Sequence, residues 1–292
     1  MINTNSNLYF ELKQYHSEHK LGGLKTKDLF SSFSKKILII LISLIKDFHV
    51  RSQDLLIEEW HELIDICNLH RLTLILYEKL KQLNPPPEIL AKLQKIYLVN
   101  SAKLIKTEHQ LRTITEQFEK HNIDYIVLKG LAFSKQLYKK EYLRPFTDID
   151  ILIKPDQFLR AREILLKIGY QAEEKLFEKL NLIEKNESFT QSSLVKIEMH
   201  WSIHCCFGIL ESENIETYFQ NKIQITDFYG LHPVDTLIYA AIHLFFLHYN
   251  SLNLIWIYDI ALLIQKINDL AAGMLSSKKL REKKQKLLYI TL

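Results

Sequence analysis

The sequence has few of the residues that mark several common protein classes. Its 292 residues include seven glycines, too few for a glycine-repeat architecture or long glycine-rich loops. The three cysteines, Cys67, Cys205 and Cys206, form no Cys-x-x-Cys motif, so neither a zinc framework nor a disulfide scaffold is expected. This cysteine usage fits a reducing cytoplasm.

The sequence also lacks long apolar runs, and it has no excess of basic residues outside positions 271–292. The strongest apolar run, residues 37–45, has about half of the length that a membrane span needs, so we expect a buried or interfacial helix and no membrane span. The first 20 residues are polar and carry no secretory signal pattern. The net charge of +4 comes from residues 271–292, where six Lys and Arg residues oppose Glu282. The nearly neutral remainder argues against a nucleic-acid partner, and the cytoplasm is the expected location.

The apolar periodicity predicts an α+β fold, a small mixed sheet flanked by N-terminal and C-terminal helical segments. Composition is that of a globular protein, with 47% apolar and 25% charged residues. Helical spacing covers residues 27–48, 53–82 and 88–120, and Pro85–Pro87 separates the last two. Further helices are expected at 233–249 and 253–268. The expected parts are a helical N-terminal region (1–120), a core (121–230), a C-terminal helical region (231–270) and a basic tail (271–292).

Asp148 and Asp150 stand at the start of the apolar, β-branched run 149–153. In a strand, residues two apart point to the same face, so both carboxylates are expected to project side by side. Two adjacent carboxylates repel each other unless a cation lies between them. Hard oxygen ligands suit Mg²⁺, which usually also binds substrate phosphates. The pair therefore points to phosphoryl or nucleotidyl transfer.

The segments around this pair add candidate site residues. Upstream, residues 123–128 predict a buried strand, Gly130 a turn that allows close approach to a phosphate, and 131–138 a helix. Lys129 stands at that turn. Downstream, residues 193–201 alternate as a strand, with Glu198 and His200 on the polar face. If this strand lies beside the Asp-x-Asp strand, Glu198 becomes a third carboxylate of the site and His200 lies one pleat away.

This order of motifs resembles the nucleotidyltransferase superfamily of polymerase-beta-like folds and, within it, the uncharacterised bacterial nucleotidyltransferase family. The resemblance covers about residues 55–265, so that 121–230 would be the nucleotidyltransferase core. The usual glycine-serine pair after the first strand is Lys129-Gly130 here, with Ser134 a turn later. The family usually continues with more helices, so we expect the chain to be shortened at its C-terminal end. The motifs that carry the resemblance are Lys129-Gly130, Arg144-Pro145, Asp148-Ile149-Asp150 and Glu198-Met199-His200-Trp201.

The resemblance implies a two-metal in-line displacement. Asp148 and Asp150 would hold Mg²⁺, while Glu198 would bind a second ion and help to deprotonate an acceptor hydroxyl. The phosphates of a nucleoside triphosphate, with ATP as the expected donor, would be steadied by Lys129, Gly130 and Arg144. The acceptor stays open between a small molecule, a peptide and a protein. His200 would orient a carboxylate or contact the substrate.

Each assignment has a structural alternative. Aspartates are common at strand starts, Glu198 would also suit a solvated strand face, and Arg144 would also serve to shape the approach to the strand or to neutralise acids. His243 is expected to be a core or partner-bonded histidine. Asp259 is expected to brace helices, with a capping role or a place in the lining of the nucleotide pocket as the alternatives. The alternative for the whole protein is a catalytically degenerate nucleotide-binding or protein-interaction module, favoured by the missing serine and opposed by the three carboxylates. A toxin-like or regulatory enzyme that modifies RNA or a protein is a third hypothesis.

Overall fold

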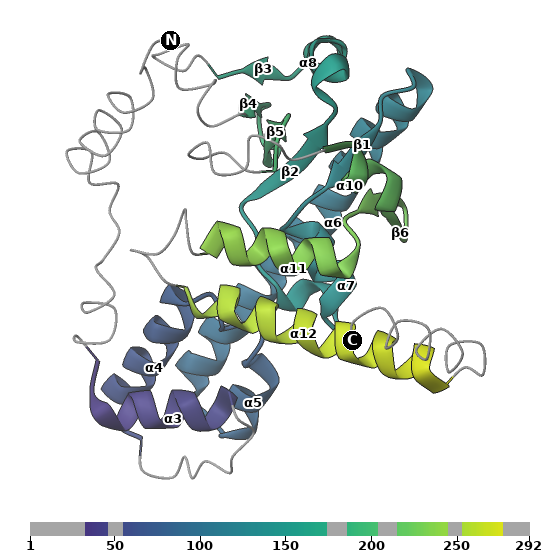
Figure 1. The fold of residues 1–292 in the computed structure, drawn as a ribbon. Helices are drawn as coiled ribbons and strands as arrows, with labels where there is room; N and C mark the ends of the chain where they lie inside the picture. Colours follow the sequence, from purple (N-terminus) through teal and green to yellow (C-terminus); the bar gives the residue numbers. More distant parts are fainter. Residues whose placement is uncertain (1–32, 46–54, 174–185, 204–214, 245–252, 277–292) are drawn as a thin grey trace, which may run out of the picture.

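The N-terminal helices form a unit with its own hydrophobic core. The computed structural model describes residues 33–45, 55–173, 186–203, 215–244 and 253–276, so the basic tail from 277 onward lies outside the described residues. Helices α3 (Lys35–Ile45), α4 (Ile57–Leu69) and α5 (Tyr77–Gln82) pack with the first turns of α6 (Pro87–Lys120). Leu41, Trp60, Leu63 and the thiol of Cys67 are buried there. This group lies at the lower left of Figure 1.

The helix expected at 53–82 is two helices in the structure. A turn after α4 separates them, and Arg71 in that turn adopts the left-handed conformation with φ of 57°. The apolar run at 37–45 lies in α3, four of whose apolar residues are buried. Among the described residues, every helix is too short or too polar to cross a bilayer.

A seven-stranded mixed sheet forms the centre of the molecule, with strand order β3-β4-β5-β2-β1-β7-β6. Strand β2 pairs antiparallel with β1 on one side and parallel with β5 on the other. The mixed sheet with flanking helices confirms the expected α+β fold class. The strands are β1 (Tyr125–Val127), β2 (Asp148–Ile153), β3 (Gln171–Ala172), β4 (Asn186–Thr190), β5 (Lys196–His200), β6 (Ile223–Ile225) and β7 (Phe228–Gly230).

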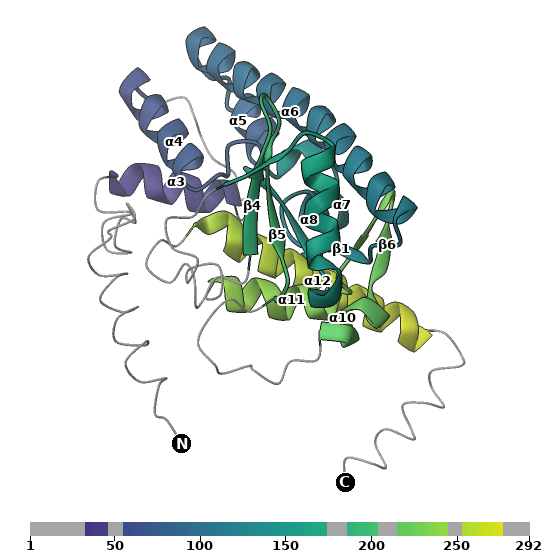
Figure 2. The same ribbon diagram turned by 90° about the horizontal axis from the view of Figure 1, so that it is seen from above.

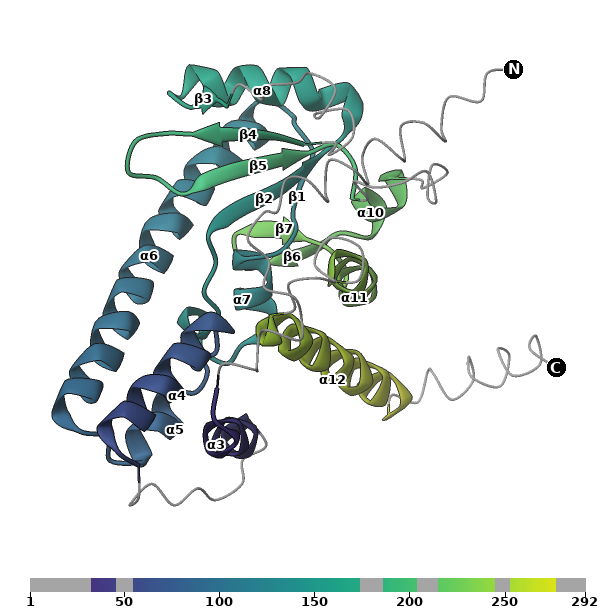
Figure 3. The same ribbon diagram turned by 90° about the vertical axis from the view of Figure 1, so that its left-hand side faces the viewer.

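Helices cover both faces of the sheet (Figures 2 and 3). On one face, α6 and α8 (Phe158–Lys167) pack on Ile149 and Ile151 of β2. On the other, α10 (Ile215–Asn221) and α11 (Pro233–Ile242) pack around Leu152. Helix α12 (Leu254–Ser276) runs beside α11 and contacts α7 (Leu131–Leu137). The remaining elements are the short 3-10 helices η1 (Glu141–Leu143) and η2 (Pro155–Gln157).

Several element boundaries differ from the sequence-based expectation. Residues 223–228 do not form one continuous strand: they belong to an antiparallel hairpin of β6 and β7, because Thr226 turns the chain with φ of 50°. Strands β3 and β4 extend the sheet and were not expected, since β3 has only two residues and four of the five residues of β4 are polar. Helix α12 continues to Ser276, beyond the expected end at 268.

Candidate active site

Parallel pairing of β2 and β5 brings the predicted carboxylates together. Asp150 stands directly opposite Glu198 in the register of the two strands, and Asp148 opposite Lys196. Because side chains alternate along a strand, Asp148, Asp150 and Glu198 share one face of the sheet while Ile149 and Ile197 enter the core on the other. The conditional expectation that the strand of Glu198 lies beside the Asp-x-Asp strand is thus met.

Asp150 is the most enclosed of these acids, with no exposed side-chain surface. Its Oδ1 accepts hydrogen bonds from the Lys129 ammonium, at 3.2 Å, and from His200 Nε2, at 3.1 Å. Burial opposes ionisation of this carboxyl, but Lys129 and His200 together outweigh it and hold the pKa of Asp150 below its usual range. Asp150 is therefore a carboxylate at neutral pH.

The other oxygen of Asp150 suggests a binding site for a cation. Asp150 Oδ2 is buried and has no hydrogen-bond partner among the described residues. One ligand atom from each of Asp150, Glu198 and His200 lies within 4.8 Å of the other two, a spacing that suits a single metal ion. Oxygen and imidazole donors of this kind fit a divalent cation.

Asp148 lies beside this group, although it is not one of its three members. Its partial burial, followed by the negative charge of Asp150, raises the pKa of Asp148. A cation between the two aspartates would relieve that repulsion. The charge of Glu198 is already partly balanced, because Lys196 donates to its Oε1 at 2.7 Å.

Lys129 is directed at protein groups. Besides Asp150, its ammonium contacts His243 Nε2 at 3.1 Å, so the turn after β1 is linked to the C-terminal end of α11 through this side chain. Burial would lower the pKa of Lys129, but the Asp150 carboxylate and the other acids around it raise the pKa above its usual value. Lys129 is therefore a fixed positive charge beside Asp148, Asp150 and Glu198, which are hereafter called the row of carboxylates.

Arg144 lies in a buried ion pair. Its Nε and Nη2 donate to both carboxylate oxygens of Asp259 in α12, at 2.8 to 3.0 Å. The guanidinium also stacks over the ring of Phe133, and Tyr138 donates its hydroxyl to Asp259 Oδ1 at 2.6 Å. Arg144 thus ties the loop before β2 to the C-terminal helix, and Asp259 braces helices as the sequence suggested.

Residues 58–292 match the sequence profile of a family described as uncharacterised nucleotidyltransferase. The chain belongs to this family. The match spans most of the chain and includes every element of the site. The resemblance found in the motifs is thereby confirmed, and the protein is a nucleotidyltransferase.

Solved structures of two antibiotic-related proteins are similar to the chain at a low level. The antibiotic-resistance factor ANT(2'')-Ia in solution is 10% identical, with a TM-score of 0.41, and the alignment covers 66% of this chain and 98% of that one. ANT(2'')-Ia in complex with adenylyl-2''-tobramycin is 11% identical, with a TM-score of 0.40 and coverage of 57% and 92%. The lincosamide adenylyltransferase LnuA with lincomycin is 17% identical, with a TM-score of 0.38 and coverage of 54% and 96%. No curated protein matches the chain.

The contacts of this candidate site include residues that the motifs did not mark as functional. His243 reaches Lys129 from α11, and Asp259 reaches Arg144 from α12, across more than one hundred positions of sequence. The signal available for Asp259 was its acidic side chain within the apolar stretch 254–264 of α12. His243 gave a similar signal, although it was interpreted as a partner-bonded histidine outside the site.

Gly130 is expected to be required for the shape of the site. Its φ of 55° is left-handed, and an added Cβ would lie 3.2 Å from the carbonyl oxygen of Asp148 and 3.4 Å from Cβ of Phe146. Gly130→Ala is expected to cost about 1–3 kcal/mol of unfolding free energy from backbone strain and to displace Asp148, so that turnover falls as well. Thermal unfolding and a turnover assay measure the two effects.

Gly169→Ala is the matched control. Gly169 also has a positive φ, of 96°, but its added Cβ would meet the Gln191 side chain, away from the aspartates. This control is expected to lose stability without a comparable loss of turnover. Equal turnover losses in both variants would contradict a specific role of Gly130.

Proposed function

We propose that the protein transfers a nucleotidyl group from a nucleoside triphosphate, with ATP as the expected donor, to a hydroxyl group in a Mg²⁺-dependent reaction. The observation that carries the proposal is the unpaired, buried Oδ2 of Asp150 beside Glu198 and His200. A buried carboxylate oxygen without a partner is costly, and a bound cation would remove that cost. Asp148, on the same face of β2, would complete the donor set.

Asp148 and Asp150 are proposed to hold one Mg²⁺, and Asp150 and Glu198 a second. Bound Mg²⁺ would neutralise the phosphates and polarise the phosphorus atom under attack. Glu198 would accept the proton of the acceptor hydroxyl as that oxygen attacks the α-phosphorus, while pyrophosphate leaves from the opposite side. Its position opposite Asp150 in the strand register supports this role.

The basic residues are proposed to have different tasks. Lys129 would neutralise Asp150 before substrate arrives and turn to the phosphates when the site is loaded. His200 would orient the Asp150 carboxylate, as its hydrogen bond to Oδ1 suggests. For Arg144 we propose a positioning role through Asp259 in place of direct phosphate binding, because its Nε and Nη2 are already engaged. Gly130 would let the chain pass close to Asp148.

The acceptor is proposed to be a hydroxyl-bearing small molecule, peptide or protein. The nearly neutral body of the chain argues against a nucleic acid. A cytoplasmic location, where ATP is abundant, belongs to the same proposal.

Glu198→Gln separates catalysis from donor binding. The variant keeps the size of the side chain but cannot accept a proton, so turnover is expected to fall by about 10²–10⁴-fold while triphosphate binding persists. Turnover and calorimetric affinity are measured on the same preparation. Glu163→Gln, at an exposed position of α8, is the control and is expected to behave as the wild type. A Glu198→Gln enzyme with full turnover would remove Glu198 from the mechanism.

The proposed reaction is tested by pyrophosphate release. The full chain is incubated with each of the four nucleoside triphosphates and Mg²⁺, with pools of hydroxyl-bearing small molecules, peptides and proteins. Pyrophosphate release that depends on one pool and on Mg²⁺ is expected, together with a mass increase of one nucleotidyl group on the acceptor. Transfer that proceeds unchanged in the presence of a Mg²⁺ chelator would contradict the proposed metal dependence.

One observation favours the alternative of a non-catalytic module. The Lys129 ammonium already contacts Asp150 Oδ1 and would replace a metal ion if it stayed there. Lys129→Met separates the two functions. If the protein is an enzyme, Lys129→Met is expected to lower turnover, because a charge that steadies the phosphates is lost. If it is a non-catalytic module, both the wild type and Lys129→Met would bind nucleotide without Mg²⁺ and release no pyrophosphate.

A further inference from the structure

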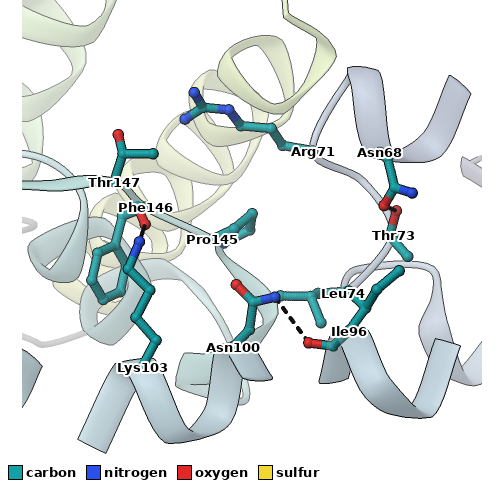
Figure 4. Close-up of a pocket in the computed structure, with 10 residues that line it drawn as sticks. All are labelled: Asn68, Arg71, Thr73, Leu74, Ile96, Asn100, Lys103, Pro145, Phe146 and Thr147. Carbon is teal, nitrogen blue, oxygen red and sulfur yellow. Dashed lines mark hydrogen bonds between the residues drawn. The ribbon is translucent and has the colours of Figure 1, made fainter. Parts of the chain in front are cut away.

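A polar cavity lies next to Asp148, outside the row of carboxylates. It has a volume of about 240 Å³ and opens between the turn after α4, the middle of α6 and the loop 145–147 that leads into β2 (Figure 4). Thr147, at its wall, directly precedes Asp148 in the chain. The cavity is therefore within reach of the end of the site at which β2 begins.

The charged groups of this cavity are both cations. Arg71 and Lys103 line it together with Asn68, Thr73, Asn100 and Thr147, and none of the described residues that line it is acidic. The Lys103 ammonium donates to the carbonyl oxygen of Phe146 at 2.5 Å, which leaves further N–H groups for another acceptor. Burial lowers the pKa of both basic groups, and the charge of Asp148 opposes that effect at each. The two cations thus belong to the electrostatic surroundings of Asp148.

Arg71 has a left-handed backbone conformation. Its φ of 57° is uncommon for a residue with a long side chain, and such strain persists where the surrounding structure enforces it. Figure 4 shows its side chain extending from the turn toward the side of the pocket where Thr147 lies. The guanidinium has no hydrogen-bond or ion-pair partner within the described part of the chain. A partly buried guanidinium of this kind has its fork of donors free for a ligand.

We propose that this cavity, hereafter the Arg71 pocket, binds an oxyanion of a substrate, a phosphate or a carboxylate, next to Asp148. The planar fork of an arginine matches the two oxygens of either group, and Lys103 adds a second positive charge. The neutral amide and hydroxyl groups of the lining supply further hydrogen bonds. The inference rests on the proposed function, since it treats Asp148 as part of the reaction centre.

Two parts of the reaction carry such a group. One is the acceptor, which would then be an anionic hydroxyl compound, and the other is the phosphate chain of the donor. In an in-line displacement the attacking hydroxyl and the leaving pyrophosphate lie on opposite sides of the phosphorus atom, so one pocket serves only one of them. The same binding experiment distinguishes these two sources.

The test uses charge-changing variants of the full chain. Arg71→Asn removes the positive charge with a residue that tolerates the left-handed conformation, and Arg71→Lys retains the charge. Lys103→Gln changes the second cation, so the test does not depend on the folding of one variant. Lys106→Gln, one turn further along α6 at an exposed position, is the control with the same loss of charge. Calorimetry measures the binding of inorganic phosphate, inorganic pyrophosphate and ATP with Mg²⁺.

Arg71→Asn and Lys103→Gln are expected to weaken the binding of at least one of these three probes by about tenfold or more, as for the loss of a charge-assisted hydrogen bond. Arg71→Lys is expected to recover part of the affinity, and Lys106→Gln to match the wild type. If ATP and phosphate compete for binding to the wild type, and the variants bind both more weakly, the pocket holds the phosphate chain of the donor. If ATP binding is unchanged and phosphate binds alongside it, the pocket belongs to the acceptor.

The inference is overturned if both Arg71→Asn and Lys103→Gln bind all three probes as Lys106→Gln does, or if the wild type binds none of them. Failure of the proposed function has a different signature. Phosphate binding that depends on Arg71 would then persist while ATP binding showed no dependence on Mg²⁺ or on Asp150.

Discussion

Replacement of Asp150 by asparagine is expected to reduce nucleotidyl transfer by at least about 10³-fold. The carboxylate joins Lys129, His200 and the proposed metal site at one buried point. Loss of its charge removes several kcal/mol of transition-state stabilisation, and about 1.4 kcal/mol corresponds to a factor of ten in rate. The turnover number at saturating triphosphate is the quantity to measure, with circular dichroism to show that the variant is folded.

Asp156→Asn provides the comparison for Asp150→Asn. Asp156 is exposed just beyond the end of β2, so the same chemical change there is expected to leave turnover within about twofold of the wild type. Asp150→Asn leaves Lys129 without its carboxylate partner, so some loss of stability is expected as well. A folded Asp150→Asn protein with near wild-type turnover would remove this residue from the reaction.

The second large effect is expected on stability. Asp259→Asn leaves the buried Arg144 guanidinium without its carboxylate, and loss of one partner from a buried ion pair costs about 3–5 kcal/mol. The hydrogen bond from the Tyr138 hydroxyl weakens in the same variant, because the acceptor loses its charge. The unfolding midpoint in urea, with the slope of the transition, measures the loss of stability.

Asp269→Asn, at an exposed position of the same helix, is expected to change the unfolding free energy by less than about 0.5 kcal/mol. The double variant Arg144→Met/Asp259→Leu replaces the pair with apolar side chains and is expected to be more stable than Asp259→Asn, since no charge is left buried. If Asp259→Asn and Asp269→Asn unfold at the same urea concentration, the pair does not hold α12 to the loop before β2.

The row of carboxylates was predictable because it follows from local patterns. Alternation along residues 193–201 determines that Glu198 and His200 share a face, and the two-residue spacing does the same for Asp148 and Asp150. The pairing of the two strands was only a conditional expectation, because no local signal specifies which strands become neighbours. The parallel register Asp150 to Glu198 had to come from the structure.

Contacts between distant segments could not be predicted in this way. The resemblance implied that Arg144 steadies phosphates, with neutralisation of nearby acids as one alternative, whereas the structure pairs it with Asp259 from α12. The break at Arg71 was also hidden, since apolar residues continue at helical spacing through it and no glycine or proline marks the turn. The Arg71 pocket depends on that turn and was invisible to the motifs.

The central claim is that Asp148 and Asp150 bind the Mg²⁺ ion that in turn binds the phosphates of a nucleoside triphosphate. The most direct measurement is calorimetric titration of each of the four triphosphates into the full chain, with and without Mg²⁺, in parallel with the Asp148→Asn/Asp150→Asn double variant. The account predicts binding that requires Mg²⁺ in the wild type and is lost in the folded double variant. Binding of equal strength in both proteins, or binding that does not change when Mg²⁺ is removed, would contradict it.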